Sequence, residues 1–126
     1  MDIIGLGMDA TEIPRVRDVL ARHGDRFLHR IFTDAEIAYC TRRRDPVPSL
    51  AGRFAAKEAA MKALGTGRSR GVLWKDIEVV RERGRAPQLR LTGGAERRFN
   101  ALNASGTLVT ISHSKELALA QVLLLR

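Results

Sequence analysis

With 126 residues, of which 44% are hydrophobic, the chain is expected to form one domain, residues 1–126, around a buried core. Its longest apolar run, residues 117–125, is too short for a membrane span, and its first eight residues lack the basic start of a signal peptide. The single cysteine, Cys40, excludes an internal disulfide, so we expect a cytoplasmic protein with no membrane partner. The net charge of +8 favours an anionic partner, but no motif supports nucleic acid, which we do not expect as a partner.

The chain begins with a predicted strand. Residues 3–9 read as a short buried strand whose two glycines permit another backbone to come close, with Asp9 at its end. Taken alone, Asp9 is expected to close an Asx turn or to cap the following helix. A catalytic or metal-binding role for Asp9 therefore needs support from elsewhere in the chain.

A helix is expected next. Thr11 and Pro14 give a start signal, and apolar residues at helical spacing continue to Gly24. Four arginines follow one another at spacings of seven, four and four: Arg15, Arg22, Arg26 and Arg30. They form one basic face if Gly24 bends the segment without reversing it. That face is either an ordinary solvated surface or a docking surface for an acidic partner.

Two further helices are predicted before the middle of the chain. Thr33 and Glu36 form a capping box that opens a helix reaching about Thr41. A loop rich in charge and proline, residues 42–48, follows it. The central helix covers about residues 49–64, because this run consists almost entirely of strong helix formers, and Gly65 stands where a left-handed C-cap belongs.

The central helix presents two opposite charges one turn apart. Glu58 and Lys62 share a face with Phe54, while Arg53 and Lys57 point elsewhere. The ordinary interpretation is an exposed ion pair that stabilises the helix by roughly 0.2–0.5 kcal/mol. In the functional interpretation, Glu58 binds a hard cation and Lys62 neutralises phosphate charge, which requires a second carboxylate from another segment.

The second half of the chain predicts a basic loop at residues 68–71, a hairpin and a helix. Residues 74–81 form a strand with mixed faces, residues 88–91 its partner, and residues 95–103 a helix after Gly93-Gly94. Strands at 107–112 and 117–125 close the chain. The polar turn between them is either a simple hairpin turn or a set of hydrogen-bond donors to an anion, namely His113, Ser114 and Lys115.

Three of these segments, in this order, resemble the 4′-phosphopantetheinyl transferases, and in particular their short, single-module members. They are Gly5-x-Gly7-x-Asp9, the run from Gly52-Arg53-Phe54-Ala55-Ala56-Lys57-Glu58-Ala59 to Lys62-Ala63-Leu64-Gly65-Thr66-Gly67, and Ser112-His113-Ser114-Lys115. The segment Trp74-x-Asp76-Ile77-Glu78-Val79 is also similar to that family. The resemblance covers residues 4 to about 124. It implies an α+β fold with a mostly antiparallel sheet packed on a long central helix.

The resemblance also implies a reaction, in which the phosphopantetheine arm of coenzyme A passes to a serine of apo acyl carrier protein. Adenosine 3′,5′-bisphosphate is released, and the modified carrier protein serves fatty acid biosynthesis. The residues matched to family roles are Asp9 and Glu58 as magnesium ligands and catalytic groups, Lys62 beside the pyrophosphate, His113 and Ser114 as coenzyme A contacts, Arg53 and Gly65 near the nucleotide and phosphates, and Arg15, Arg22 and Arg26 as the surface that receives the carrier protein.

These residue types suit that chemistry. Attack on a pyrophosphate phosphorus needs neutralisation of charge, and Mg²⁺ usually takes one or two carboxylates, with phosphates and water completing its coordination. Lys62 is a compact charge suited to the leaving phosphate. The general base stays open between Glu58 and a water polarised by the metal. Larger relatives carry a third acidic ligand where this chain has Thr11, so we expect water there and a mainly structural Glu12.

The resemblance to a single-module enzyme further implies a homotrimer whose three sites lie at subunit interfaces. His113 and Ser114 would then reach the phosphates bound by Asp9, Glu58 and Lys62 of a neighbour. Two alternatives remain at this stage. The chain could be a small basic adaptor that binds an acidic protein or nucleic acid without catalysis, or a transferase that modifies a carrier domain within a large synthase.

Overall fold

The computed structural model describes residues 1–67 and 69–126. Its elements in chain order are β1 (Ile3–Glu12), α1 (Ile13–His23), α2 (Asp25–Ile31), α3 (Asp34–Thr41), α4 (Val47–Leu64), the 3-10 turn η1 (Trp74–Asp76), β2 (Ile77–Val80), β3 (Gln88–Leu91), α5 (Gly93–Ala101), β4 (Gly106–His113) and β5 (Leu117–Leu125). The expected basic loop at 68–71 begins at Arg68, which lies outside the described residues. No helix in the described ranges is both long and apolar enough to cross a bilayer.

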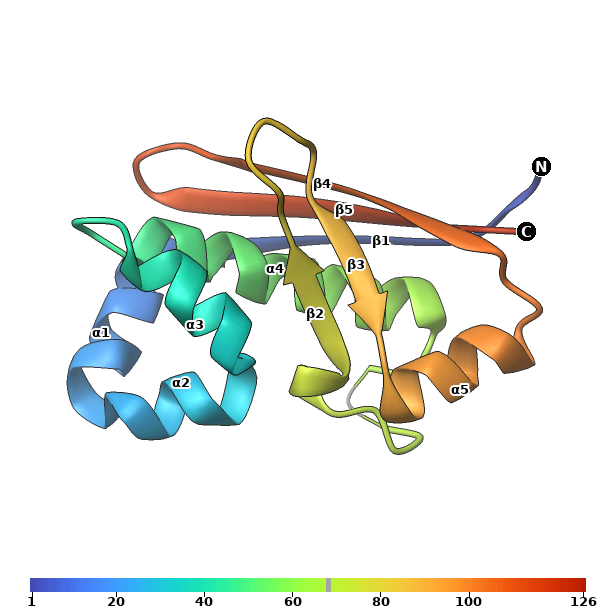
Figure 1. Ribbon diagram of the computed structural model, residues 1–126, viewed down its shortest axis with the longest axis horizontal. Helices are drawn as coiled ribbons and strands as arrows, with labels where there is room; N and C mark the ends of the chain where they lie inside the picture. The colour runs from blue at the N-terminus through green and yellow to red at the C-terminus, as the bar shows by residue number, and fades with distance from the viewer. Residues whose placement is uncertain (68) are drawn as a thin grey trace.

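Both sheets are antiparallel. β1, β5 and β4 form a three-stranded sheet in that order, and β2 pairs with β3 in a separate hairpin. The long helix α4 runs beneath the three-stranded sheet, with α1, α2 and α3 gathered at one end and α5 at the other (Figure 1). The expected α+β fold, with a mostly antiparallel sheet on a long central helix, is confirmed.

The close contact between α4 and the sheet depends on two glycines of β1. A Cβ atom added to Gly7 would lie 1.8 Å from the carbonyl oxygen of Ala59, and one added to Gly5 would lie 2.3 Å from that of Ala63. Since small residues face each other on both sides of this contact, strand and helix backbones approach more closely than larger side chains would allow. The close approach predicted from the glycines of β1 is therefore confirmed.

Helix α4 belongs to two cores. Its second half packs with β2, β5 and α5 in one cluster of buried apolar residues, and its first half packs with α1, α2 and α3 in another. Because both clusters include residues of α4, this helix joins the sheet to the helical end of the molecule. Side chains on different flanks of α4 therefore face different surroundings.

Several predicted caps are confirmed. The hydroxyl of Thr33 accepts a hydrogen bond from the Glu36 N–H, and the Glu36 carboxylate accepts one from the Thr33 N–H, which is the expected capping box of α3. Gly65 ends α4 in the left-handed conformation, at φ 73° and ψ 24°. Gly24, at φ 50° and ψ −125°, does more than bend one helix, because it separates α1 from α2.

Some predicted boundaries are wrong. β1 continues to Glu12, so Asp9 lies inside the strand instead of at its end, and α1 shows no side-chain cap. The interpretation of Asp9 as a helix cap is therefore wrong. α4 begins at Val47, two residues earlier than expected, because a proline in the first helical turn loses no hydrogen bond.

The later elements also shift. Trp74 belongs to the 3-10 turn η1 and not to a strand, because the Asp76 carboxylate accepts a hydrogen bond from the Leu73 N–H and closes that turn. β2 starts only after it. Gly93 and Gly94 lie within α5, and β4 extends to His113, which therefore ends a strand.

Candidate active site

Asp9 and Lys62 are held together on one flank of α4. Asp9 lies opposite Ala120 of β5, and its side chain is 12% exposed. The Lys62 ammonium donates to Asp9 Oδ1 at 3.0 Å and to the Met8 carbonyl oxygen at 3.0 Å. The Thr11 hydroxyl donates to Asp9 Oδ2 at 3.3 Å. The Asp9 carboxylate is thus oriented by one neighbour on its own strand and by one on α4.

Asp9 and Glu58 face a common cavity of about 270 Å³. Apolar side chains form its wall, among them Val16, Val19 and Phe54, and Arg15 stands at it as well. The second carboxylate that the functional interpretation of Glu58 required is thus found on β1. Two carboxylates suit Mg²⁺, which usually leaves several positions to phosphate and water. Within residues 1–67 and 69–126 there is no cluster of three or more His, Cys, Asp or Glu side chains placed to hold a metal.

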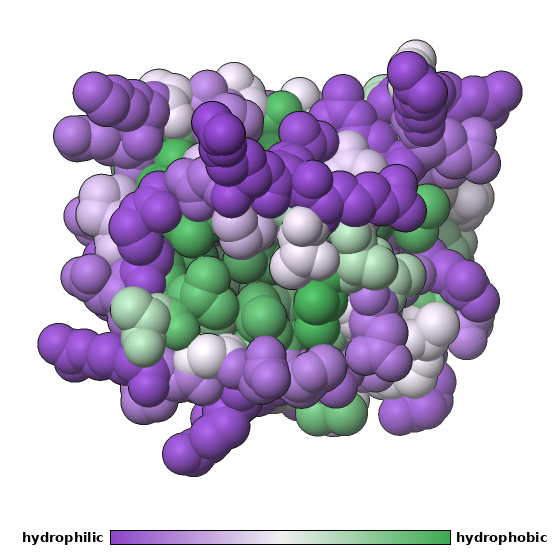
Figure 2. Space-filling model, turned by 60° about the vertical axis from the view of Figure 1, so that its left-hand side comes forward, coloured by the Kyte–Doolittle hydropathy of each residue, from purple (hydrophilic) through white to green (hydrophobic). Residues whose placement is uncertain are grey.

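A second, more open cavity of about 400 Å³ continues from the first. The two share Val19, Phe27 and Phe54, and the Phe54 ring stacks on Trp74 with centroids 5.1 Å apart. The molecular surface at the helical end shows apolar area framed by hydrophilic side chains (Figure 2). Of the four arginines singled out by their spacing, Arg15 lines the first cavity, Arg26 and Arg30 line the second, and the exposed Arg22 lines neither.

Arg53 points to the other flank of α4. Five positions along an α-helix correspond to a rotation of about 140°, so Arg53 and Glu58 face different sides. Arg53 is 6% exposed, its Nη1 donates to the Ser49 hydroxyl at 3.1 Å, and its guanidinium lies 4.1 Å from the centre of the Tyr39 ring. Its buried Nε has no hydrogen-bond partner among the described residues. This guanidinium is held in place by Ser49 and Tyr39, and its Nε–H can still donate a hydrogen bond to a ligand.

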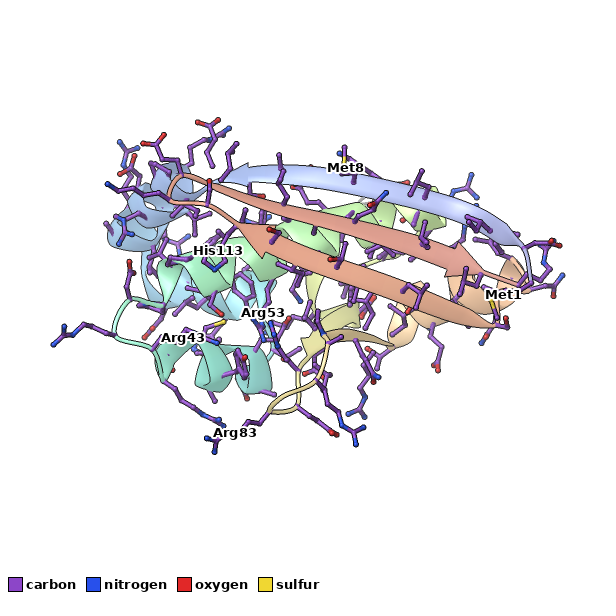
Figure 3. All side chains as sticks on the ribbon, turned by 90° about the horizontal axis from the view of Figure 1, so that it is seen from above. Met1, Met8, Arg43, Arg53, Arg83 and His113 are labelled. Atoms are coloured by element: carbon purple, nitrogen blue, oxygen red, sulfur yellow. The ribbon has the colours of Figure 1, made fainter. Side chains whose placement is uncertain are left out.

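A basic cavity of about 600 Å³ lies on that flank. Arg53, Arg43, Arg81, Arg83 and His113 all line it. In Figure 3, Arg43, Arg53, Arg83 and His113 lie toward the β4 edge of the sheet, whereas Met8 lies on β1 at the opposite edge. Because its four arginines outnumber the two carboxylates that also line it, Asp45 and Glu82, the cavity suits an anionic group such as a phosphate.

Tyr39 and Arg43 are contributors to this cavity that the sequence did not single out. The Arg43 guanidinium donates to the Tyr39 hydroxyl at 3.1 Å. Partial burial raises the pKa of Tyr39, but the hydrogen bond from Arg43 and the charges of Arg43 and Arg53 outweigh it and lower that pKa overall. The only signal in the sequence was the run of arginines at residues 42–44, which does not reveal a tyrosine one turn earlier as its partner.

The remaining candidates are Ser114 in the β4–β5 turn and Gly65 at the end of α4. Ser114 shares an open hollow of about 710 Å³ with His113 and Lys115, and its hydroxyl accepts hydrogen bonds from the N–H groups of Glu116 and Leu117, which shapes the β4–β5 turn. Gly65 is exposed at the end of α4, where its N–H donates to the Lys62 carbonyl oxygen. Within one chain, Asp9, Glu58 and Lys62 therefore form one group, and Arg53, His113 and Ser114 form another.

The chain is similar to known proteins over nearly its whole length. The profile of the 4′-phosphopantetheinyl transferase superfamily matches residues 5–120. The holo-[acyl-carrier-protein] synthase of Koribacter versatilis is 46% identical over 122 residues, which make up 97% of this chain and 98% of that protein. The one of Methylobacterium nodulans is 49% identical over 121 residues, or 94% of this chain and 92% of that protein.

Solved structures agree. The holo-[acyl-carrier-protein] synthase of Neisseria meningitidis superimposes with a TM-score of 0.91 at 28% identity, covering 99% of this chain and 100% of that one. The Helicobacter pylori enzyme in complex with coenzyme A gives a TM-score of 0.83 at 29% identity, covering 94% and 98%. The chain belongs to the 4′-phosphopantetheinyl transferase superfamily. Within it, the relatives narrow the assignment to the holo-[acyl-carrier-protein] synthases, which makes the chain an enzyme.

Proposed function

We propose that the chain transfers the 4′-phosphopantetheine moiety of coenzyme A to a serine of apo acyl carrier protein. It does so in a magnesium-dependent reaction of fatty acid biosynthesis in the cytoplasm, with release of adenosine 3′,5′-bisphosphate. The observation that carries the proposal is the convergence of the Asp9 and Glu58 carboxylates on one cavity, with the Lys62 ammonium 3.0 Å from Asp9. The structure of a relative from Bacillus anthracis, in complex with CoA (3′,5′-ADP), superimposes on this chain with a TM-score of 0.80 at 36% identity.

Three residues that line this cavity, Asp9, Thr11 and Glu58, have a role in the proposed reaction, as does Lys62 beside Asp9. Asp9 and Glu58 would hold Mg²⁺, which when bound neutralises charge on the pyrophosphate. Thr11 orients the Asp9 carboxylate through its 3.3 Å hydrogen bond. Lys62, whose side chain is 54% exposed, is free to move from Asp9 toward the leaving phosphate as negative charge develops there. The proton of the attacking serine passes to Glu58 or to a water beside it.

The second group of residues would hold the nucleotide. Arg53 and His113 line the basic cavity on the other flank of α4, which suits the adenosine phosphate end of coenzyme A. Since this cavity and the one at Asp9 open on different flanks of one helix, we propose that each active site combines Asp9, Glu58 and Lys62 of one copy with His113 and Ser114 of another. Three copies in a closed ring would then form three equivalent sites.

An apolar sheet face supports this homotrimer. On the side of the three-stranded sheet that faces away from α4, Leu6 lies opposite Leu123, which lies opposite Leu108, and Met8 and Leu119 share this face. Leu6, Met8 and Leu108 are each more than half exposed in the single chain. Exposed apolar patches of this kind mark protein interfaces. A second copy fits because the patch is continuous with the strands that carry Asp9 and His113.

The carrier protein would dock on the arginines near the first two cavities. Arg15 and Arg26 line adjoining cavities, and Arg22 is exposed on the same helix as Arg15. An acidic carrier placed there would bring its serine toward Asp9 and Glu58. In this proposal residues 1–126 act as one domain.

Mass spectrometry of the carrier tests the reaction. We would incubate the purified chain with coenzyme A, Mg²⁺ and an apo acyl carrier protein, with a chelator control and with an excised carrier domain of a large synthase as a second acceptor. A magnesium-dependent mass gain equal to phosphopantetheine supports the proposal, and the better acceptor identifies the carrier class. No gain on either acceptor argues against it and favours a non-catalytic adaptor.

A further inference from the structure

A fully buried ion pair lies on the side of α4 that faces away from the three-stranded sheet. Lys57 of α4 and Glu36 of α3 are 21 positions apart, and Lys57 Nζ lies 2.7 Å from Glu36 Oε1. Both side chains have no exposed surface. Neither residue lines the cavities described above, and the proposed reaction assigns no role to the pair.

Every polar group of the pair has a partner. The Lys57 ammonium also donates to the Trp74 carbonyl oxygen at 3.1 Å and to the Ile77 carbonyl oxygen. The Glu36 carboxylate accepts from the Val79 N–H at 3.0 Å in addition to the Thr33 N–H of its own cap. One ammonium group and one carboxylate thus tie α3, η1 and β2 to α4.

Such a pair contributes more to geometry than to stability. Moving two charges out of water costs about as much as their attraction returns, and apolar replacements of similar volume are often equally stable. The contacts of Gly5 and Gly7 already fix the sheet side of α4, so the Lys57 pair fixes the opposite side. Its value lies in the position it gives to the elements that it joins.

Those elements carry the side chains that support both flanks of α4. Tyr39 of α3 packs against the Arg53 guanidinium at the basic cavity, and Trp74 of η1 stacks on Phe54, which lines the cavity of Asp9 and Glu58. Both supporting residues lie on segments that Glu36 and Lys57 hold. A shift of α3 or η1 would therefore move Arg53 and Phe54 together.

We propose that Lys57 and Glu36 are positioning residues, whose ion pair holds Tyr39 and Trp74 so that Arg53 and Phe54 keep the two cavities of the active site in shape. The role in the reaction rests on the proposed function. The effect on side-chain position does not, and Trp74, the only tryptophan of the chain, reports it directly.

The test replaces both charges at once. Glu36→Leu/Lys57→Met removes the ion pair without leaving a buried unpaired charge. Glu36→Gln/Lys57→Met is a second version that keeps a hydrogen-bonding side chain at the α3 cap, should the first fail to fold. Lys75→Met is the matched control, because Lys75 is an exposed neighbour of Trp74. Circular dichroism establishes the folded state of each variant.

Two measurements follow on the folded variants. Without substrate, we expect a red shift of Trp74 emission and stronger quenching by acrylamide. With coenzyme A, Mg²⁺ and carrier protein, we expect kcat/KM to fall on the order of tenfold, with KM for coenzyme A raised, because misplaced binding groups lower both binding and rate. Lys75→Met should leave both measurements unchanged.

Wild-type Trp74 fluorescence in a folded double variant would overturn the positioning by the ion pair, whatever the substrate. Changed fluorescence with unchanged kcat and KM would overturn its role in the reaction. Failure of the wild-type chain to modify any carrier would instead contradict the proposed function, and it is recognised separately because the fluorescence is measured without substrate.

Discussion

Lys62 of α4 donates a hydrogen bond to the Asp9 carboxylate of β1, although the two residues lie 53 positions apart. The ammonium lies 3.0 Å from Asp9 Oδ1, and the Thr11 hydroxyl approaches Oδ2. A carboxylate has about four acceptor sites, so both oxygens keep capacity for a further ligand on the side of the cavity. This contact joins strand and helix at the place where the proposed chemistry occurs.

Replacement of Asp9 by Asn should reduce kcat/KM for carrier modification on the order of 100-fold or more, because the amide is neutral and a weaker metal ligand. Circular dichroism should stay unchanged, since the shape of the side chain is kept. A magnesium titration of the rate is the measurement, with Glu96→Gln on the exposed face of α5 as the matched control. Wild-type turnover of the Asn variant at low magnesium would remove Asp9 from the metal site.

Mixed oligomers test the proposed active site shared between copies. Glu58→Gln and His113→Ala should each be inactive alone, because every site then lacks one contributor. Mixing the two variants should restore part of the activity, since some interfaces combine an intact Glu58 of one copy with an intact His113 of the next. The measurement is carrier modification after subunit exchange, with light scattering to determine whether the chain is a trimer. Two inactive variants that never complement each other would place both residues in a site within one chain.

Charge reversal at Arg26 should weaken binding of the carrier protein. We expect Arg26→Glu to raise KM for the carrier about tenfold at low ionic strength, with a smaller effect as salt screens the interaction. KM for coenzyme A should not change, because Arg26 does not line the basic cavity of Arg53. Steady-state kinetics at two salt concentrations measure this. Arg97→Glu is the control, because Arg97 is an exposed residue of α5. An equal effect in both variants would mean that only the net charge of the chain affects carrier binding.

Cys40 should react slowly in the folded protein. Burial raises the pKa of its thiol, which outweighs the opposing hydrogen bond with Ser49. We therefore expect labelling by a thiol reagent at pH 8 to be at least about tenfold slower in the native chain than in denaturant. Because the pKa of the Cys40 thiol is higher when the chain is folded, the neutral thiol stabilises the folded chain. This contribution is complete below the unfolded pKa of about 8.5, and it is lost as pH rises from there through the folded-state pKa.

Comparison of the native chain with the Cys40→Ala variant measures the pH-dependent contribution of the Cys40 thiol to stability. The difference between their free energies of unfolding should shrink from pH 7 to pH 10. Rapid labelling of the native chain at pH 8, at the rate seen in denaturant, would mean that the helical end of the molecule opens easily.

Local signals in the sequence were sufficient for much of the fold. The capping box of Thr33 and Glu36, the left-handed Gly65 and the helix formers of α4 each depend on neighbours within a few residues, and the structure has all three. The glycines of β1 predicted a close backbone approach, and α4 lies there. The helical repeat of 3.6 residues per turn also placed Glu58 and Lys62 on a common flank.

Only the tertiary structure decided which distant residues meet. No local rule predicts that β1 continues past Asp9, that Arg53 packs against Tyr39, or that Glu36 serves as both a cap and the partner of buried Lys57. The sequence alone determined most of the elements, though not all of their boundaries, and the resemblance to a family. Contacts between elements depend on strand register, helix rotation and burial, which are fixed only when strands and helices pack together. These long-range contacts stabilise the fold only once the intervening chain has closed, so local signals cannot predict them.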